Sequence, residues 1–281
     1  MFHVKNKIIL SLIILCLCAA TLLASCTENT TNNNSANNPG PGQSTILTEP
    51  EKAHYLIKDT PADSPAKTLS NDGEVFSSLV IEKLSITQHD RINKPAAAKM
   101  KEVLVAQGEK RINDIYYSNA DALLAQMKQE DFDKSTLPHK MTVDYTCVRN
   151  DGRAISILET IDSYSADKLQ SSITTAYNFI PLTGERIGQP FYTVGNSDEF
   201  NAADNTMYEK LLSKYGEEVI SYNNVSASFV DAATDCWYFT QDGKGIAVKF
   251  SAGRIAPVEA GDLEIEYSKE ELPEFAQKFF N

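Results

Sequence analysis

The chain has 281 residues, of which 42% are hydrophobic and 23% are charged, so it is not a disordered or fibrous protein as a whole. It carries 26 basic and 38 acidic residues, which gives a formal net charge of -12. This charge excludes a typical nucleic-acid binder, which needs basic side chains against the phosphates, and a general binder of anionic membrane surfaces.

Residues 1–25 have the layout of a secretory signal peptide. Two lysines precede an almost entirely apolar run from Ile8 to Ala20, which is the usual order of a charged and then an apolar region. A short membrane anchor is an alternative, although the run is near the lower length limit for spanning and no basic residues follow it. Residues 23–26 read Leu-Ala-Ser-Cys and resemble the bacterial lipobox. The resemblance implies cleavage before Cys26, lipidation of its thiol and anchoring on the outer face of a bacterial membrane.

Residues 26–73 are expected to form a tether behind the lipidated cysteine. Thr27 to Pro50 is rich in Asn, Thr, Gly and Pro and has almost no apolar residues. Such a segment cannot bury enough surface to offset its ordering entropy, so it should be flexible. Glu51 to Gly73 is transitional and ends in the turn sequence Asn-Asp-Gly.

Residues 74–140 are expected to form an N-terminal strand and helix. Val75 to Thr87 is rich in β-branched residues, which predicts a strand. From Pro95 to about Glu130 the apolar residues recur at helical spacing, and Pro95 suits a first helical turn. Gly108 is a position at which this helix could bend or break.

Residues 141–281 contain several segments with strand-like alternation. The first three segments predict an antiparallel meander, with a turn at residues 150–152: 141–148, 154–161 and 172–180. Further strands are predicted at 236–240, 245–250 and 263–267, and helices at 198–219 and 270–280. The fold class is therefore α+β, an antiparallel β meander packed with a long N-terminal helix, a middle helix and a C-terminal helix.

Several short sequence segments, each typical of a strand, a turn and a second strand, resemble those of a known protein family. The chain reads Trp-Tyr-Phe-Thr-Gln-Asp-Gly at 237–243, Gly-Ile-Ala-Val-Lys-Phe at 245–250 and Thr-Thr-Ala-Tyr-Asn-Phe at 174–179. With Leu-Thr-Gly-Glu at 182–185, these residues resemble the RsiV-like C-terminal domain of bacterial envelope proteins. The part before residue 141 resembles the companion N-terminal domain that commonly precedes it.

The resemblance implies an extracytoplasmic role rather than one activity. Family members include the lysozyme receptor of an anti-sigma factor, domains in front of polysaccharide deacetylases, and lone lipoproteins, and the layout of this chain matches the last group. Members often carry Gly-Gly-Ala-His before the third meander strand, whereas residues 165–170 here read Ser-Ala-Asp-Lys-Leu-Gln. Lysozyme recognition therefore does not follow from the resemblance alone.

The histidines do not form a catalytic set. A nucleophilic enzyme needs a base beside its Ser, Thr or Cys. His3 lies in the signal, His54 lies in the linker, and His89 and His139 lie in expected turns. No enzyme activity and no cofactor are expected.

The cysteines and aspartates also fail to form a recognisable metal motif. Cys147 and Cys236 are solitary, so a zinc site is not indicated. They either pair as a disulfide, which an extracytoplasmic location permits, or lie buried as free thiols. Asp231, Asp235 and Asp242 could ligate Ca²⁺, but they lack the EF-hand pattern, and turn chemistry accounts better for Asp242.

Glu159 is an acidic residue in an apolar strand context. Strand alternation places it on the same face as Ile155 and Ile157, where a buried carboxyl group could act as an acid. A bulge or strand end near Thr160 would instead turn it towards water, and this exposed arrangement is the one we expect.

Two segments are candidates for ligand recognition. The sequence Trp237-Tyr238-Phe239 could form a platform for stacking on carbohydrate, but alternation sends Trp237 and Phe239 to one face, and the core is their more usual place. The loop 251–261 joins two strands and should lie at the surface. Its residues Arg254, Pro257 and Glu259 are the expected partner-binding residues.

These observations predict a non-catalytic, lipid-anchored envelope protein. Its ligand would be a cell-wall glycan or a basic protein such as a lysozyme-type hydrolase, because an acid excess attracts cationic partners. One alternative is a structural or assembly accessory of another envelope protein. A cell-wall hydrolase or deacetylase is a further alternative, which the missing histidine and metal sets disfavour.

Overall fold

The computed structural model describes residues 55–58, 66–82, 84–88, 94–220, 228–234 and 236–280. All of them belong to one compact unit, Thr48–Asn281. The predicted signal peptide and Cys26 lie outside the described residues. None of the helices in the described ranges is long and apolar enough to cross a membrane.

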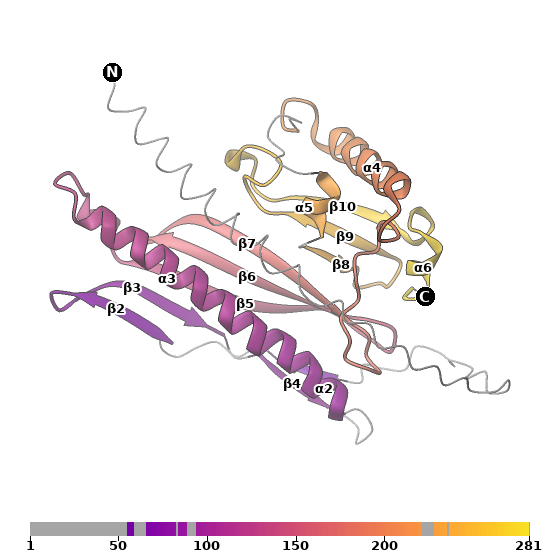
Figure 1. The fold of residues 1–281 in the computed structure, drawn as a ribbon, viewed down its shortest axis with the longest axis horizontal. Helices are drawn as coiled ribbons and strands as arrows, with labels where there is room; N and C mark the ends of the chain where they lie inside the picture. Colours follow the sequence, from indigo (N-terminus) through magenta and orange to yellow (C-terminus); the bar gives the residue numbers. More distant parts are fainter. Residues whose placement is uncertain are drawn as a thin grey trace. The chain divides into compact units, whose positions relative to one another are not determined.

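A five-stranded sheet forms the centre of an α+β fold (Figure 1). Its strands, in spatial order, are β2 (Lys67–Asn71), β3 (Glu74–Ile81), β5 (His139–Asn150), β6 (Ile155–Ser165) and β7 (Lys168–Phe179). The predicted meander corresponds to β5, β6 and β7, which pair antiparallel. In contrast, β3 and β5 pair in parallel. This pairing places the two parts predicted for 74–140 and 141–281 in one sheet.

The tether predicted for 26–73 is too long, because two short strands lie within it. Strand β1 (Tyr55–Lys58) pairs with β4 (Ser85–Gln88), and β2 pairs with β3. The single strand predicted for 75–87 is also wrong, since it is divided into β3 and β4. The chain turns away after β3, where the Glu82 amide donates to Val143 O and the Glu82 carboxylate accepts from the Tyr145 amide.

The helical segment predicted for 95–130 has three successive parts. They are α2 (Lys94–Lys101), a π-helical turn (Glu102–Gln107) and α3 (Gly108–Met127). Gly108 has a helical φ of -63° and begins α3 without breaking the helix. Figure 1 shows α3 lying along one face of the five-stranded sheet. The core between the sheet and the whole helical segment, α2 to α3, contains the following side chains: Leu79, Met100, Leu104, Ile112, Tyr116, Val143, Ile157 and Phe179.

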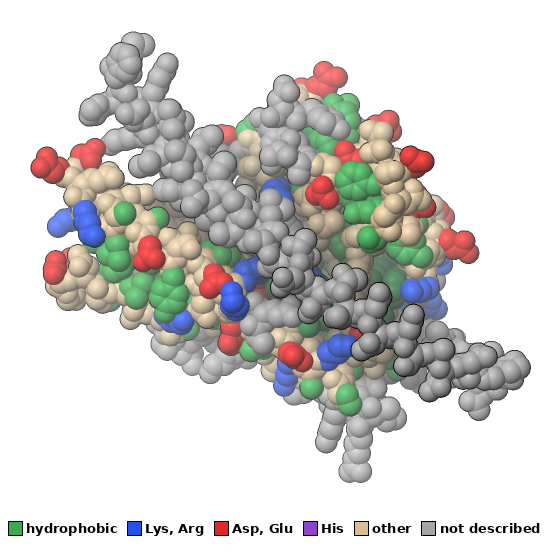
Figure 2. All heavy atoms as spheres, viewed as in Figure 1, with side chains coloured by type: hydrophobic (Ala, Val, Ile, Leu, Met, Phe, Trp, Pro, Cys, Tyr) green, Lys and Arg blue, Asp and Glu red, His purple; other side chains and the backbone are tan. Residues whose placement is uncertain are grey.

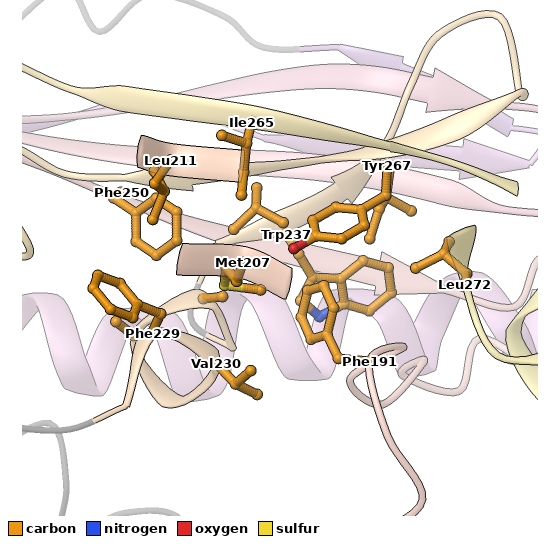
Figure 3. Close-up of a cluster of buried hydrophobic side chains, with 14 of the residues drawn as sticks. Phe191, Met207, Leu211, Phe229, Val230, Trp237, Phe250, Ile265, Tyr267 and Leu272 are labelled. Atoms are coloured by element: carbon orange, nitrogen blue, oxygen red, sulfur yellow. The ribbon is translucent and has the colours of Figure 1, made fainter. Parts of the chain in front are cut away.

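A second, three-stranded antiparallel sheet has the order β10 (Leu263–Ser268), β9 (Gly245–Phe250) and β8 (Trp237–Phe239). Helices α4 (Ser197–Tyr215) and α5 (Phe229–Ala233) pack on it. Figure 3 shows the shared core, which includes Phe191, Met207, Leu211, Phe229, Trp237, Phe250, Ile265 and Tyr267.

The C-terminal helix predicted for 270–280 is much shorter in the structure. A 3₁₀ turn (Lys269–Glu271) is followed by α6 (Glu274–Gln277). Pro273 stands at the N-cap of α6 in an extended conformation, and the residue before a proline is disfavoured in a helix. Two other 3₁₀ turns lie at Lys134–Thr136 and Val258–Ala260.

Two buried polar side chains join the two sheets. Asn178 Nδ2 donates to Trp237 O (2.7 Å), and Ser156 Oγ accepts from the Phe239 amide (3.1 Å) and donates to Asn178 Oδ1 (2.6 Å). Ser156 and Asn178 are neighbours on β6 and β7. They satisfy backbone groups of β8 that do not pair with β9, so β8 meets the face of the large sheet that is opposite α3.

Candidate partner-binding surface

Helix α4 is fixed along the outer edge of β10 by three side chains. Tyr215 Oη accepts from the Glu264 amide and donates to Glu264 O, both at 2.8 Å. Lys214 Nζ donates to Glu264 O (2.7 Å), and Lys210 Nζ donates to Glu266 O (3.0 Å). Both lysine ammonium groups are therefore used at the β10 edge.

Acidic side chains occupy the exposed surface around α4 and α6. Figure 2 shows Asp and Glu side chains on the side of the molecule where α4 lies in Figure 1, and further ones on the side of α3. An ion pair between Lys210 Nζ and Glu271 Oε1 (2.6 Å) links α4 to the 3₁₀ turn at 269–271. We call the following exposed residues the acidic surface: Asp198, Glu209, Glu217, Glu218, Glu270 and Glu274. Such a surface attracts cationic partners at long range. The sequence signal for it was the formal net charge of -12, which also fits plain solubility.

The predicted recognition loop at 251–261 is tied to the fold at both ends. Ser251 Oγ accepts from the Thr174 amide of β7 (3.2 Å), and the Ala252 amide donates to Asp262 Oδ1 (3.0 Å). Pro257 and Glu259 are exposed and Arg254 is half-buried. The loop also sends Ile255 and Ala256 into the core. Loop 251–261 is thus an anchored surface connection, and its partner-binding role stays a prediction.

The aromatic triplet 237–239 belongs mainly to the core. Trp237 and Phe239 are 4% and 1% exposed, and their ring centroids lie 5.4 Å apart. Tyr238 points to the other face of the small sheet and donates its hydroxyl hydrogen bond to Glu264 Oε2. Burial, together with this bond, raises the pKa of Tyr238. Trp237 and Phe239 therefore cannot form a stacking platform at the surface.

Glu159 is buried, so the expected exposed arrangement is wrong. Its side chain is fully buried, and β6 stays paired on both sides at this position, with Tyr145 and Thr175 as neighbours. The bulge of the β6–β7 pair lies further along, at 163–164. Regular alternation therefore keeps Glu159 on the face covered by α3, with Ile157.

Arg111 of α3 neutralises the buried carboxylate. Its Nη2 forms an ion pair with Glu159 Oε1, and its Nη1 donates to Thr175 Oγ1 (2.7 Å). The same Nη2 lies 3.3 Å from Tyr177 Oη. Sequence reasoning missed Arg111, although its position four residues before Ile115 placed a charge on the apolar side of the predicted helix. The arrangement holds α3 on the sheet.

The remaining candidate residues are dispersed. His139 begins β5, and burial lowers its pKa, whereas His3, His54 and His89 lie outside the described residues. Cys147 and Cys236 are both free thiols, one exposed and one buried, so the disulfide alternative is wrong.

Neither described member of the suggested Ca²⁺ set, Asp231 or Asp242, belongs to a metal-binding group. Asp242 shapes a turn by accepting from Thr240 Oγ1 (2.7 Å) and from the Lys244 amide (3.1 Å). Asp231 lies in the first turn of α5, and Asp235 is not among the described residues. Within the part of the chain that the structure describes, no group of three His, Cys, Asp or Glu residues could hold a metal ion.

Comparisons with known proteins show the fold. No family model and no curated protein matches the sequence. A crystal structure of a DUF3298 family member from Bacteroides fragilis matches with a TM-score of 0.54 and 12% identity, covering 81% of this chain and 98% of that chain. A DUF3298 family protein from Pseudomonas aeruginosa matches with a TM-score of 0.50 and 8% identity, covering 82% and 97%. The chain thus shares its fold with bacterial DUF3298 proteins, the RsiV-like C-terminal domain type.

Proposed function

We propose that this protein is a non-catalytic, lipid-anchored envelope protein that binds a basic protein, such as a lysozyme-type hydrolase, through the acidic surface. The observation that carries the proposal is that the basic side chains of α4 are bonded to β10, whereas acidic side chains on and after α4 are exposed. Lys210 and Lys214 are engaged at the β10 edge, while Asp198, Glu209 and Glu217 remain exposed. The acidic side chains are therefore available to a cationic partner.

The lipobox motif supports an extracytoplasmic location, where such a partner would be found. Lipidation of Cys26 would hold the protein on the outer side of a bacterial membrane, where secreted hydrolases act. The part at 141–281 would be the RsiV-like domain and 74–140 its companion, both serving as a binding scaffold. Charge complementarity speeds the encounter of such partners and sets their specificity, so the complex should weaken as salt rises.

The test is a titration of the detergent-solubilised full chain with lysozyme at low and physiological salt. A triple variant, Asp198→Asn with Glu209→Gln and Glu217→Gln, is expected to weaken saturable binding by about tenfold. The matched control removes the same charge from the α3 region with the changes Asp121→Asn, Glu130→Gln and Asp131→Asn, three exposed residues. Equal losses in both variants, or binding seen only at low salt, would contradict the proposal.

A further inference from the structure

Val194 is 83% exposed, more than any other large hydrophobic side chain in the part of the chain that the structure describes. It lies in a tight turn that leads into α4, in which the Asn196 amide donates to Thr193 O (2.9 Å). Gly195 has a φ of +91°, the left-handed value that the third residue of a type II turn requires. A single exposed apolar residue is common on protein surfaces, so its significance depends on how the turn is held.

The side chains of Asn196 and Glu199 fix this turn from the helix side. Glu199 Oε2 accepts from the Thr193 amide (2.7 Å), and Glu199 Oε1 accepts from Asn196 Nδ2 (2.7 Å). Asn196 Oδ1 accepts from the Glu199 amide (3.2 Å) and caps α4. The hydrogen bonds from Thr193 and Asn196 lower the pKa of Glu199, so the carboxylate is charged and holds the turn at neutral pH.

The Gln189 side chain fixes the segment that precedes the turn. Its Oε1 accepts from the amides of Phe191 (2.8 Å) and Tyr192 (3.2 Å), and its Nε2 donates to Tyr192 O (2.6 Å). The Phe191 ring is buried in the core of the small sheet, with its centroid 5.9 Å from that of Tyr267. The turn is therefore anchored on both sides before any partner binds.

An aromatic pair closes the base of the segment that carries Val194. Tyr192 precedes the turn and Phe200 follows it, and their ring centroids lie 5.1 Å apart in an edge-to-face arrangement. Both rings are half-buried and pack against the core of the small sheet. We call Tyr192, Val194 and Phe200 the apolar knob. Aromatic rings in such positions supply rigid contact area at low entropic cost.

The surroundings of the apolar knob are acidic. Asp198 and Glu199 are exposed in the first turn of α4. Burial raises the pKa of Tyr192, and the charge of the exposed Asp231 raises it further, so this carboxylate lies near the tyrosine hydroxyl. The sequence has no lysine or arginine between Arg186 and Lys210. A partner surface around the knob would therefore be basic, because an acidic one would be repelled.

We propose that the apolar knob anchors the basic partner, with Val194 inserted into an apolar pocket whose rim carries lysine or arginine side chains. This inference rests on the proposed function and deepens it by naming the contact that holds the complex together. The acidic side chains speed the encounter, and salt weakens their effect. Burial of Val194 is not screened by salt, and a turn that is already ordered loses little entropy on binding. The knob thus controls dissociation, whereas the acidic surface controls association.

The test measures the association and dissociation rates of the detergent-solubilised full chain on immobilised lysozyme at low and physiological salt. Val194→Ser is expected to speed dissociation by about tenfold, through the loss of one buried valine side chain, with little change in the association rate. The triple variant of the acidic surface, Asp198→Asn with Glu209→Gln and Glu217→Gln, should instead mainly slow association. Val75→Ser, at an exposed valine of β3, is the matched control and should bind like the wild type.

The outcomes separate the anchor from the proposed function. Because Val194 is exposed, Val194→Ser should keep the wild-type midpoint of unfolding by urea, so faster dissociation would report a lost contact. An unchanged dissociation rate in Val194→Ser, or an equal change in Val75→Ser, would overturn the anchor and leave the proposed function standing. The absence of saturable wild-type binding at physiological salt would overturn the proposed function together with the anchor.

Discussion

Gly108 at the start of α3 lies against the carboxylate of Glu159. A Cβ at position 108 would come within 3.2 Å of Glu159 Oε2, and that oxygen is buried without a hydrogen-bond partner. The glycine follows the π-helical turn at 102–107, and such turns often occur at sites with special packing demands. Position 108 therefore gives space to the buried ion pair one turn before Arg111.

Gly108→Ala tests this relationship directly. Alanine is the better helix former by about 1 kcal/mol, so an unconstrained helical glycine would gain stability from the change. We expect instead a loss of about 1 kcal/mol, because the added methyl group crowds Glu159. Urea unfolding followed by circular dichroism measures the change, and a more stable Gly108→Ala protein would show that the carboxylate has room to move.

The Arg111–Glu159 pair should be strongly coupled. Replacing Glu159 by Gln leaves the Arg111 charge without its counter-ion in a partly buried place, at an expected cost of about 3 kcal/mol. Arg111→Met should cost a similar amount, because it leaves the fully buried carboxylate uncompensated. The double variant should be less destabilised than the sum of the two. Additive losses in urea unfolding would mean that the two side chains act independently.

Gly184 should be intolerant of any side chain. It has a φ of +67°, and a Cβ there would lie 2.9 Å from the Ala96 Cα and overlap the Ala96 carbonyl. Gly261 has a similar φ of +70° but nothing within 4 Å of its added Cβ. Gly261→Ala therefore measures the conformational cost alone, about 1 kcal/mol. We expect Gly184→Ala to lose at least about 2 kcal/mol in thermal or urea unfolding, and equal losses at both positions would refute the close approach.

Asp151 should make stability depend on pH in the acid range. Burial alone would raise its pKa, but hydrogen bonds from the Arg149 side chain and from the amides of Ala154 and Arg153 outweigh burial and lower it. The stabilisation is therefore fully present above the unfolded pKa, about 3.9, and is lost as pH falls through the lower folded pKa. Asp151→Asn should lower unfolding free energy at pH 7 and differ less from the wild type at pH 3.

A matched control separates this effect from general charge removal. Asp167→Asn removes the same charge at an exposed position in the β6–β7 turn. We expect its urea midpoint to follow that of the wild type at both pH values. A constant difference between Asp151→Asn and the wild type from pH 7 to pH 3 would count against the hydrogen-bonded carboxylate.

Local patterns were sufficient to predict the meander but not its partners in space. Strands β5, β6 and β7 follow from alternation and turn residues that are close in the chain. The parallel pairing of β3 with β5 brings Leu79 beside Met141, and no local pattern reports such a distant pairing. The same limit applies to β1 and β2, whose backbone bonds come from β4 and β3 and not from their own composition.

The candidate sites show the same limit: residues close in the sequence could be placed correctly, but their partners from distant parts of the chain could not. Alternation alone placed Glu159 beside Ile157, and the error came from assuming that a carboxylate would leave that face. Its partner Arg111 is 48 residues earlier in the chain, so the pair that makes burial possible was not visible locally.

The hydrogen bonds to the two edge strands of the small sheet also affect how copies of this protein can associate. Tyr215 and two lysines cap the β10 edge, and Ser156 and Asn178 cap β8. A capped edge gives no template for a strand from another chain. Backbone-mediated growth into dimers or fibres would therefore have to begin at a strand edge outside the three-stranded sheet, for example at β2 or β7. The small sheet therefore cannot be extended by pairing its edge strands with a strand of a neighbouring molecule.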